Sequence, residues 1–185
     1  MEKKNTIYKI ATTSIFAALV FVSNMISVPI PVAIGDVSRI HFGNIFCLLS
    51  GLVLGGLQGG LAAGIGSFLY DLTIPAYIAS SPFTFVFKFL LAFTAGALSR
   101  IGDKNGEKFL WNLLSCTLGQ VVYIVLYLSK SFFQGLLEGS APMALIPSIV
   151  TKLTTSSINA VIAIIISIPL SIIIRKALVK SKLLG

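Results

Sequence analysis

The sequence has little charge. Only 11% of its 185 residues are charged, with six acidic residues against fourteen lysines and arginines. Soluble domains carry roughly 25% charged residues. Because hydrophobic residues make up 56% of the chain, a soluble protein of this length could not cover them. The composition therefore excludes an ordinary soluble domain and favours an integral membrane protein, whose apolar surface faces lipid.

The residue patterns of common enzymes and metal sites are also missing. The chain has a single histidine, His41, and two cysteines, Cys47 and Cys116, in apolar runs without zinc-like or redox spacing. It has no GxxxxGK[ST] phosphate-binding loop, so it does not hydrolyse ATP by that route. Residues 64–68 differ from the GxSxG elbow of hydrolases. We therefore expect no metal, no cofactor and no catalytic activity, and a membrane-embedded enzyme is the weakest interpretation.

Six apolar stretches predict six transmembrane helices in one domain, residues 1–185. They run from about Ile7 to Val28, Phe42 to Leu54, Leu57 to Leu72, from after Pro82 to Leu98, Phe109 to Phe133, and Ile146 to Leu178. A spanning helix needs roughly 20 apolar residues, and these runs do not alternate as barrel strands do. The second and third stretches are short, and the glycines between them predict a tight helical hairpin. The expected fold is an all-α integral membrane protein.

The positions of the basic residues predict the orientation of this bundle. With the N-terminus in the cytoplasm, ten of the fourteen basic residues lie on the cytoplasmic side, as the positive-inside rule requires. These ten are Lys3, Lys4, Lys9, Arg100, Lys104, Lys108, Arg175, Lys176, Lys180 and Lys182. Both termini are therefore predicted to be cytoplasmic. The net charge of +8 has its explanation in this topology, and we expect no nucleic-acid partner.

Glycines recur at four-residue spacing around the predicted hairpin, at Gly51, Gly55 and Gly59 and at Gly56, Gly60 and Gly64. Small residues at this spacing let helix backbones approach closely. Internal packing is the simpler interpretation, and close approach of a ligand or partner is the alternative.

Several polar side chains lie within predicted spans, where they are costly and usually face a cavity or a partner. Lys88 lies about two turns into the fourth helix, where it either contacts a ligand or extends toward water. Lys152 and Asn159 share one face of the sixth helix, and the amide of Asn159 needs a partner. Asp71 could pair with Lys88 or Arg39, or bind a cationic ligand.

Tyr123, Tyr127 and Lys130 share one face of the fifth helix. They form either an aromatic belt at the membrane interface or the wall of a pocket in which phenol rings stack on a planar ligand.

Four segments, taken in order, resemble the substrate-binding S-components of energy-coupling factor (ECF) vitamin transporters. They are residues 35–44, the glycine-rich hairpin, Tyr70-Asp71, and Pro82-Phe83-Thr84 with Lys88. The sequence is most similar to the group that handles pantothenate, hydroxymethylpyrimidine and pyridoxine-like compounds. The resemblance implies a multi-pass protein of a prokaryotic cell membrane that captures a small water-soluble vitamin from outside. It also implies partners, which are a transmembrane scaffold subunit and two ATPase subunits.

The resemblance further implies roles for individual residues. Arg39, His41 and Asn44 would belong to a lid over the ligand. The pocket would draw on Tyr70, Asp71, Tyr77, Lys88, Tyr123, Tyr127, Lys152 and Asn159. The face that docks on the scaffold would include Ala11, Ser14 and Ala18, where small residues permit close packing. The excess of cations suggests a ligand with a carboxylate or phenolate. A stand-alone facilitator or channel without ATPase partners is the competing hypothesis.

Overall fold

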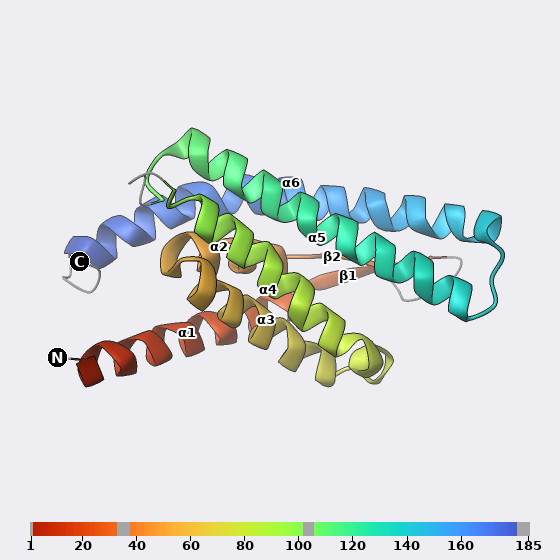
Figure 1. Ribbon diagram of the computed structural model, residues 1–185, viewed down its shortest axis with the longest axis horizontal. Helices are drawn as coiled ribbons and strands as arrows, with labels where there is room; N and C mark the ends of the chain where they lie inside the picture. Colours follow the sequence, from red (N-terminus) through yellow and green to blue (C-terminus); the bar gives the residue numbers. More distant parts are fainter. Residues whose placement is uncertain (1, 33–37, 102–105, 181–185) are drawn as a thin grey trace.

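The computed structural model describes residues 2–32, 38–101 and 106–180. Within them the chain forms six α-helices in the predicted order (Figure 1). The helices are α1 (Glu2–Met25), α2 (Gly43–Leu54), α3 (Gly56–Leu72), α4 (Ser81–Leu98), α5 (Phe109–Leu137) and α6 (Pro142–Lys180). A 3₁₀ helix, η1 (Pro75–Ser80), precedes α4. The last helix begins before Pro147, which we expected at its start and which lies inside it.

A short β-hairpin, which we did not predict, follows α1. Strand β1 (Ser27–Ile30) pairs antiparallel with β2 (Ser38–His41), so that Ser27 lies opposite His41. The fold is therefore not purely helical, and α1 ends before Val28, where we expected it to end. The pairing satisfies backbone groups that a lipid environment could not. Residues 35–37 of the expected lid lie outside the described residues.

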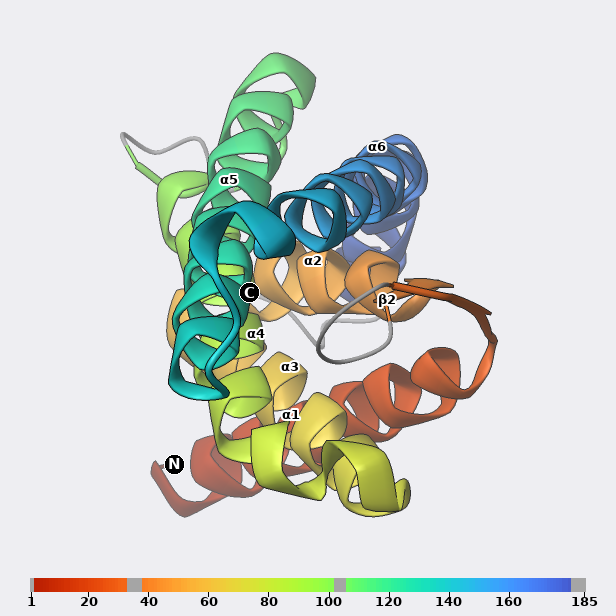
Figure 2. The ribbon, with the colours of Figure 1, turned by 90° about the vertical axis from the view of Figure 1, so that its right-hand side faces the viewer.

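Helix α2 occupies the middle of the bundle, and this position explains its shortness. When the molecule is viewed along its long axis, α2 lies between α6 on one side and α3 and α1 on the other (Figure 2). Helix α2 packs on α1, α3, α4 and α6. Ten of its twelve residues are buried. Because protein surrounds α2 on most sides, the length rule for a helix bathed in lipid does not apply to it.

The glycine pattern serves the packing of α2, α3 and α4. A Cβ atom added at Gly59 of α3 would lie 2.5 Å from the Cα of Gly51 in α2. One added at Gly60 would lie 2.9 Å from the ring of Phe89 in α4. Real side chains essentially never come this close, so glycine is what lets these backbones approach. Of the two interpretations, the structure supports internal packing.

Two arginines hold the C-terminal end of α2. The guanidinium of Arg100 donates to the carbonyl oxygens of Leu52 and Val53 at 3.1 and 2.9 Å, and to Gly51 at 3.1 Å. Arg175 of α6 donates to Leu52 at 3.1 Å. The last carbonyls of a helix have no partner within it and carry its negative dipole end. The arginines therefore satisfy these carbonyls inside the protein.

Four of the helical segments are long and apolar enough to cross a membrane. Among the described residues these are Thr6–Met25, Pro75–Leu98, Phe109–Leu137 and Pro142–Leu178. Helices α2 and α3 have only 12 and 17 residues. The structure thus supports a helical membrane protein, while six complete spans stay a prediction. Both chain ends lie at the same end of the molecule (Figure 1), as an even number of crossings requires.

Candidate substrate-binding site

A polar cavity lies inside the bundle beside the hairpin. Its volume is about 80 Å³. Side chains from β2, η1 and every helix except α2 line it. They are Asn24, Ser38, Arg39, His41, Ser67, Asp71, Tyr77, Ser80, Phe83, Thr84, Phe87, Lys88, Tyr123, Tyr127, Lys130, Ser156 and Asn159. Such a concentration of polar groups in an apolar bundle is what a binding site for a water-soluble molecule requires.

Lys88 projects from α4 into the protein interior and does not reach water. Its side chain is only 3% exposed, and its ammonium donates a hydrogen bond to the amide oxygen of Asn44. The ammonium also lies 4.2 Å from the centre of the Tyr123 ring, a cation–π arrangement. The Asn44 amide nitrogen donates in turn to Gln120 at 3.3 Å. Asn44 does not line the cavity, so it positions Lys88 from behind.

Arg39 crosses from the hairpin to α3 and η1. Its Nη2 lies 3.4 Å from a carboxylate oxygen of Asp71, so the structure pairs Asp71 with Arg39. The guanidinium carbon lies 4.4 Å from the ring centre of Tyr77 and 5.0 Å from that of Tyr70. Its Nη1 is buried and has no hydrogen-bond partner within the described residues. Arg39 therefore fastens the hairpin to α3 and η1 beside the cavity.

The amide of Asn159 on α6 binds the backbone of β2. Its oxygen accepts from the His41 amide at 3.0 Å, and its nitrogen donates to the Arg39 carbonyl at 2.7 Å. The hydroxyls of Ser38 and Thr155 share a third hydrogen bond between β2 and α6. The buried amide of Asn159 therefore has its hydrogen-bond partners in the backbone of the hairpin.

His41 is held as a neutral imidazole. Its Nδ1 accepts a hydrogen bond from the Gly43 amide at 3.1 Å. Burial lowers the pKa of His41 well below its usual value, and the nearby charges of Lys88 and Arg39 lower it further. Near neutral pH this side chain therefore adds no charge to the cavity.

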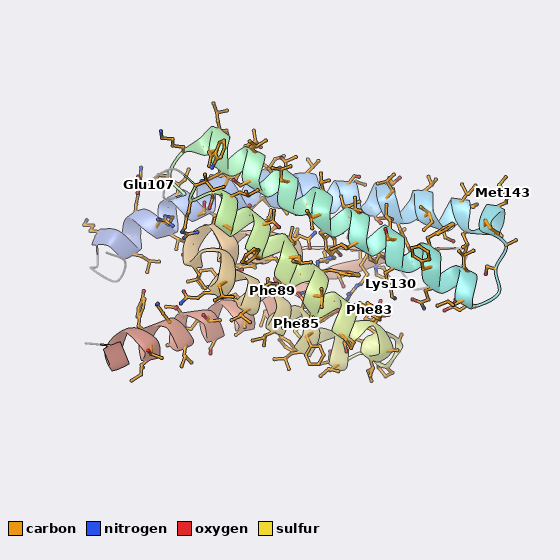
Figure 3. The ribbon with its side chains drawn as sticks, in the orientation of Figure 1. Phe83, Phe85, Phe89, Glu107, Lys130 and Met143 are labelled. Atoms are coloured by element: carbon orange, nitrogen blue, oxygen red, sulfur yellow. The ribbon has the colours of Figure 1, made fainter. Side chains whose placement is uncertain are left out.

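The aromatic face of α5 forms a wall of the cavity. The rings of Tyr123 and Tyr127 are parallel, with centres 6.0 Å apart. Lys130 donates to the Ser80 hydroxyl at 2.8 Å, and its ammonium lies 5.8 Å from the centre of the Phe83 ring. Figure 3 shows Lys130 and Phe83 close together, away from Glu107. Of the two interpretations of this face, its position favours the pocket wall over an interface belt.

Two of the predicted pocket residues lie elsewhere. Lys152 is buried between α5 and α6, where it donates to Ser131 at 3.2 Å. It does not line the cavity. Tyr70 touches Arg39 and the ring of Phe21 without lining the cavity. Both side chains therefore support the structure around the site.

The cavity also contains residues that sequence reasoning missed. Asn24 is 2% exposed and reaches the cavity from α1. An amide within an apolar run was a usable signal, because buried polar groups need partners. Ser67 and Ser156 gave no comparable signal, since serines inside helices commonly bond their own backbone.

The proposed docking residues lie on the outer face of α1. Ala11, Ser14 and Ala18 are exposed, whereas Ala17 on the other face is buried toward α3. This face is therefore not used to pack the bundle.

The sequence matches the ECF-type riboflavin transporter S component family over residues 4–176. The chain belongs to this family. The S component is thus a membrane-embedded transport subunit and not an enzyme. It is also similar to the "uncharacterized protein in gap 3'region" of Pyrococcus woesei, with 30% identity over 115 residues that cover 62% of this chain and 72% of that protein. No solved structure matches this S component.

Proposed function

We propose that this S component captures a compact, water-soluble vitamin or precursor for an ATP-driven ECF importer. It would bind its ligand from outside the cell and dock on a transmembrane scaffold. ATP hydrolysis by two ATPase subunits would then drive release of the ligand inside. The observation that carries the proposal is the cavity, which gathers charged and aromatic side chains beneath a hairpin. Two of its lining residues, Phe83 and Lys130, lie toward the end of the molecule away from both termini (Figures 1 and 3). With cytoplasmic termini, that end faces outward.

The charges around the cavity favour an anionic ligand. Arg39, Lys88 and Lys130 line it, whereas Asp71 is its single lining carboxylate within the described residues. Asp71 is already paired with Arg39. The Nη1 of Arg39 is a buried donor with no partner among the described residues. A buried donor without an acceptor costs free energy. A carboxylate or phenolate would supply that acceptor.

The size of the cavity favours a compact ligand. A buried water needs about 10–15 Å³ of such volume, so about 80 Å³ corresponds to only a handful of water molecules. A pantothenate-, hydroxymethylpyrimidine- or pyridoxine-like molecule has fewer atoms to place there than riboflavin, so it needs less widening of the site. The three fused rings of riboflavin, the vitamin in the family name, would require the hairpin or the Tyr123–Tyr127 wall to move furthest outward.

Mass spectrometry of small molecules that co-purify with the chain tests the ligand directly. Isothermal titration with pantothenate, hydroxymethylpyrimidine, pyridoxine and riboflavin then ranks their affinities. We expect stoichiometric binding of a compact ligand and much weaker binding of riboflavin. Tight riboflavin binding would contradict the size argument.

Transport assays in vesicles separate the proposal from a stand-alone facilitator. The chain alone should bind ligand without moving it across the membrane. Uptake should require the scaffold, both ATPases and ATP. Uptake by the chain alone would overturn the importer model.

A further inference from the structure

A second hollow lies at the opposite end of the molecule from the vitamin cavity. It has a volume of about 500 Å³ and lies between the segment that leads into α5 and the last turns of α6. Its lining is Gly106, Glu107, Ile172, Arg175, Lys176 and Lys180. Figure 3 places Glu107 at the end where Figure 1 shows both termini, far from Lys130 and Phe83. The two hollows are therefore separate sites.

The charge of this second hollow is strongly unbalanced. Among the residues that the structure describes, three cationic side chains from α6 and one carboxylate, that of Glu107, line this hollow. Arg175 is fixed in place because it also donates to the carbonyl of Leu52 in α2 at 3.1 Å. Lys176 and Lys180 are exposed and share a face of α6 at a spacing of four residues. A fixed guanidinium beside two mobile ammonium groups suits a phosphate, which accepts several charge-assisted hydrogen bonds.

An apolar surface follows the basic hollow along the chain. It lies on the first turns of α5 between Lys108 and Thr117, and all of its residues belong to that segment. Glu107 lines the basic hollow, and the next residue, Lys108, belongs to the apolar surface. Phe109 and Leu110 at its start are 55% and 76% exposed. A phosphate site next to an apolar surface matches a molecule that carries both a phosphate and acyl chains.

We propose that Arg175, Lys176 and Lys180 bind the phosphate of an anionic phospholipid headgroup, with an acyl chain along the start of α5. Basic hollows between transmembrane helices are suited to such headgroups. A free phosphate would use the cations but would gain nothing from the apolar surface beside them. This site does not depend on the identity of the vitamin or on the importer partners.

Native mass spectrometry of the full chain in detergent tests the proposal. Phosphatidylglycerol and phosphatidylcholine with identical acyl chains are added in competition, and the retained lipid is counted. We expect a clear preference for phosphatidylglycerol. In K176Q/K180Q that preference should fall by about fivefold for each lysine removed. The matched control is K9Q, which removes an exposed lysine of α1 outside the hollow and should keep the preference.

Two further arms make the outcome decisive. K176R/K180R keeps both charges and should retain the preference, while size-exclusion profiles and thermal melts show that each variant is folded. Inorganic phosphate at millimolar concentration should not displace the lipid. Equal retention of the two lipids by the unaltered chain, or an unchanged preference in folded K176Q/K180Q, would overturn the proposal. Displacement by inorganic phosphate would assign the site to a free anion and overturn the lipid as its ligand.

Discussion

Replacing Lys88 with methionine should separate ligand affinity from stability. The lysine is almost fully buried, and it contacts the Asn44 amide oxygen and the Tyr123 ring, both neutral. Methionine fills a similar volume without the charge. If the ammonium binds an anionic ligand, the substitution removes a charge-assisted hydrogen bond worth about 1.5–3 kcal/mol. The dissociation constant should then rise by roughly 10- to 150-fold.

The same substitution should leave the ligand-free protein about as stable as before. Burying an ammonium costs several kcal/mol, which methionine would recover. Methionine also leaves the Asn44 oxygen without its donor, at a cost of about 1–3 kcal/mol. Because these effects oppose each other, we expect no large fall in the melting temperature of the ligand-free chain.

Isothermal titration with the co-purified ligand and thermal melts without it measure the two quantities. Lys152→Met is the matched control, because Lys152 is also about 2% exposed but binds Ser131 outside the cavity. It should change the dissociation constant less than twofold. A Lys88→Met protein that is folded and binds with unchanged affinity would refute the role of Lys88 in the site.

Three other predictions concern different parts of the molecule. Ser14→Trp with Ala18→Trp should leave vitamin binding intact and abolish uptake in vesicles with the complete importer; loss of both would indicate misfolding instead. Arg100→Leu should lower the free energy of unfolding by about 3 kcal/mol or more, measured by thermal or denaturant melts, because it strips the buried carbonyls at the end of α2. Because the folded protein keeps His41 neutral, stability should fall as the pH drops below about 6.5, where the unfolded chain binds a proton that the folded chain refuses. In His41→Gln, stability should fall less between pH 7.5 and pH 5. An equally steep fall in this variant would show that His41 is not the cause.

The helices were predictable because their signal is long and redundant. Each rests on a dozen or more apolar residues, so an error at one position changes little. The hairpin was not predictable, because residues 27–30 continue the apolar run of α1 and only their pairing with residues 38–41 distinguishes them. That pairing is tertiary information, and no local pattern contains it.

The sequence predicted site residues whose charged or amide side chains lie within membrane spans, and it did not predict their partners. Lys88 and Asn159 stood out because charges and amides within a span need a reason. Their partners did not, since Asn44, Gln120 and the backbone of β2 come from distant parts of the chain. Lys152 shows the limit of this reasoning. A buried lysine can donate its hydrogen bond to a neighbouring helix instead of a ligand. Its position within a predicted span does not distinguish these two roles.

The hydrogen bonds of Arg100 and Arg175 at the end of α2 are independent of the contacts that hold the hairpin. Arg100, two residues after α4, and Arg175, in the last turns of α6, bind the carbonyls of residues 51–53 through four hydrogen bonds. At the other end, the hairpin is fastened to α6 and α3 by a few side chains. Displacing the hairpin would break none of the hydrogen bonds that Arg100 and Arg175 make to α2.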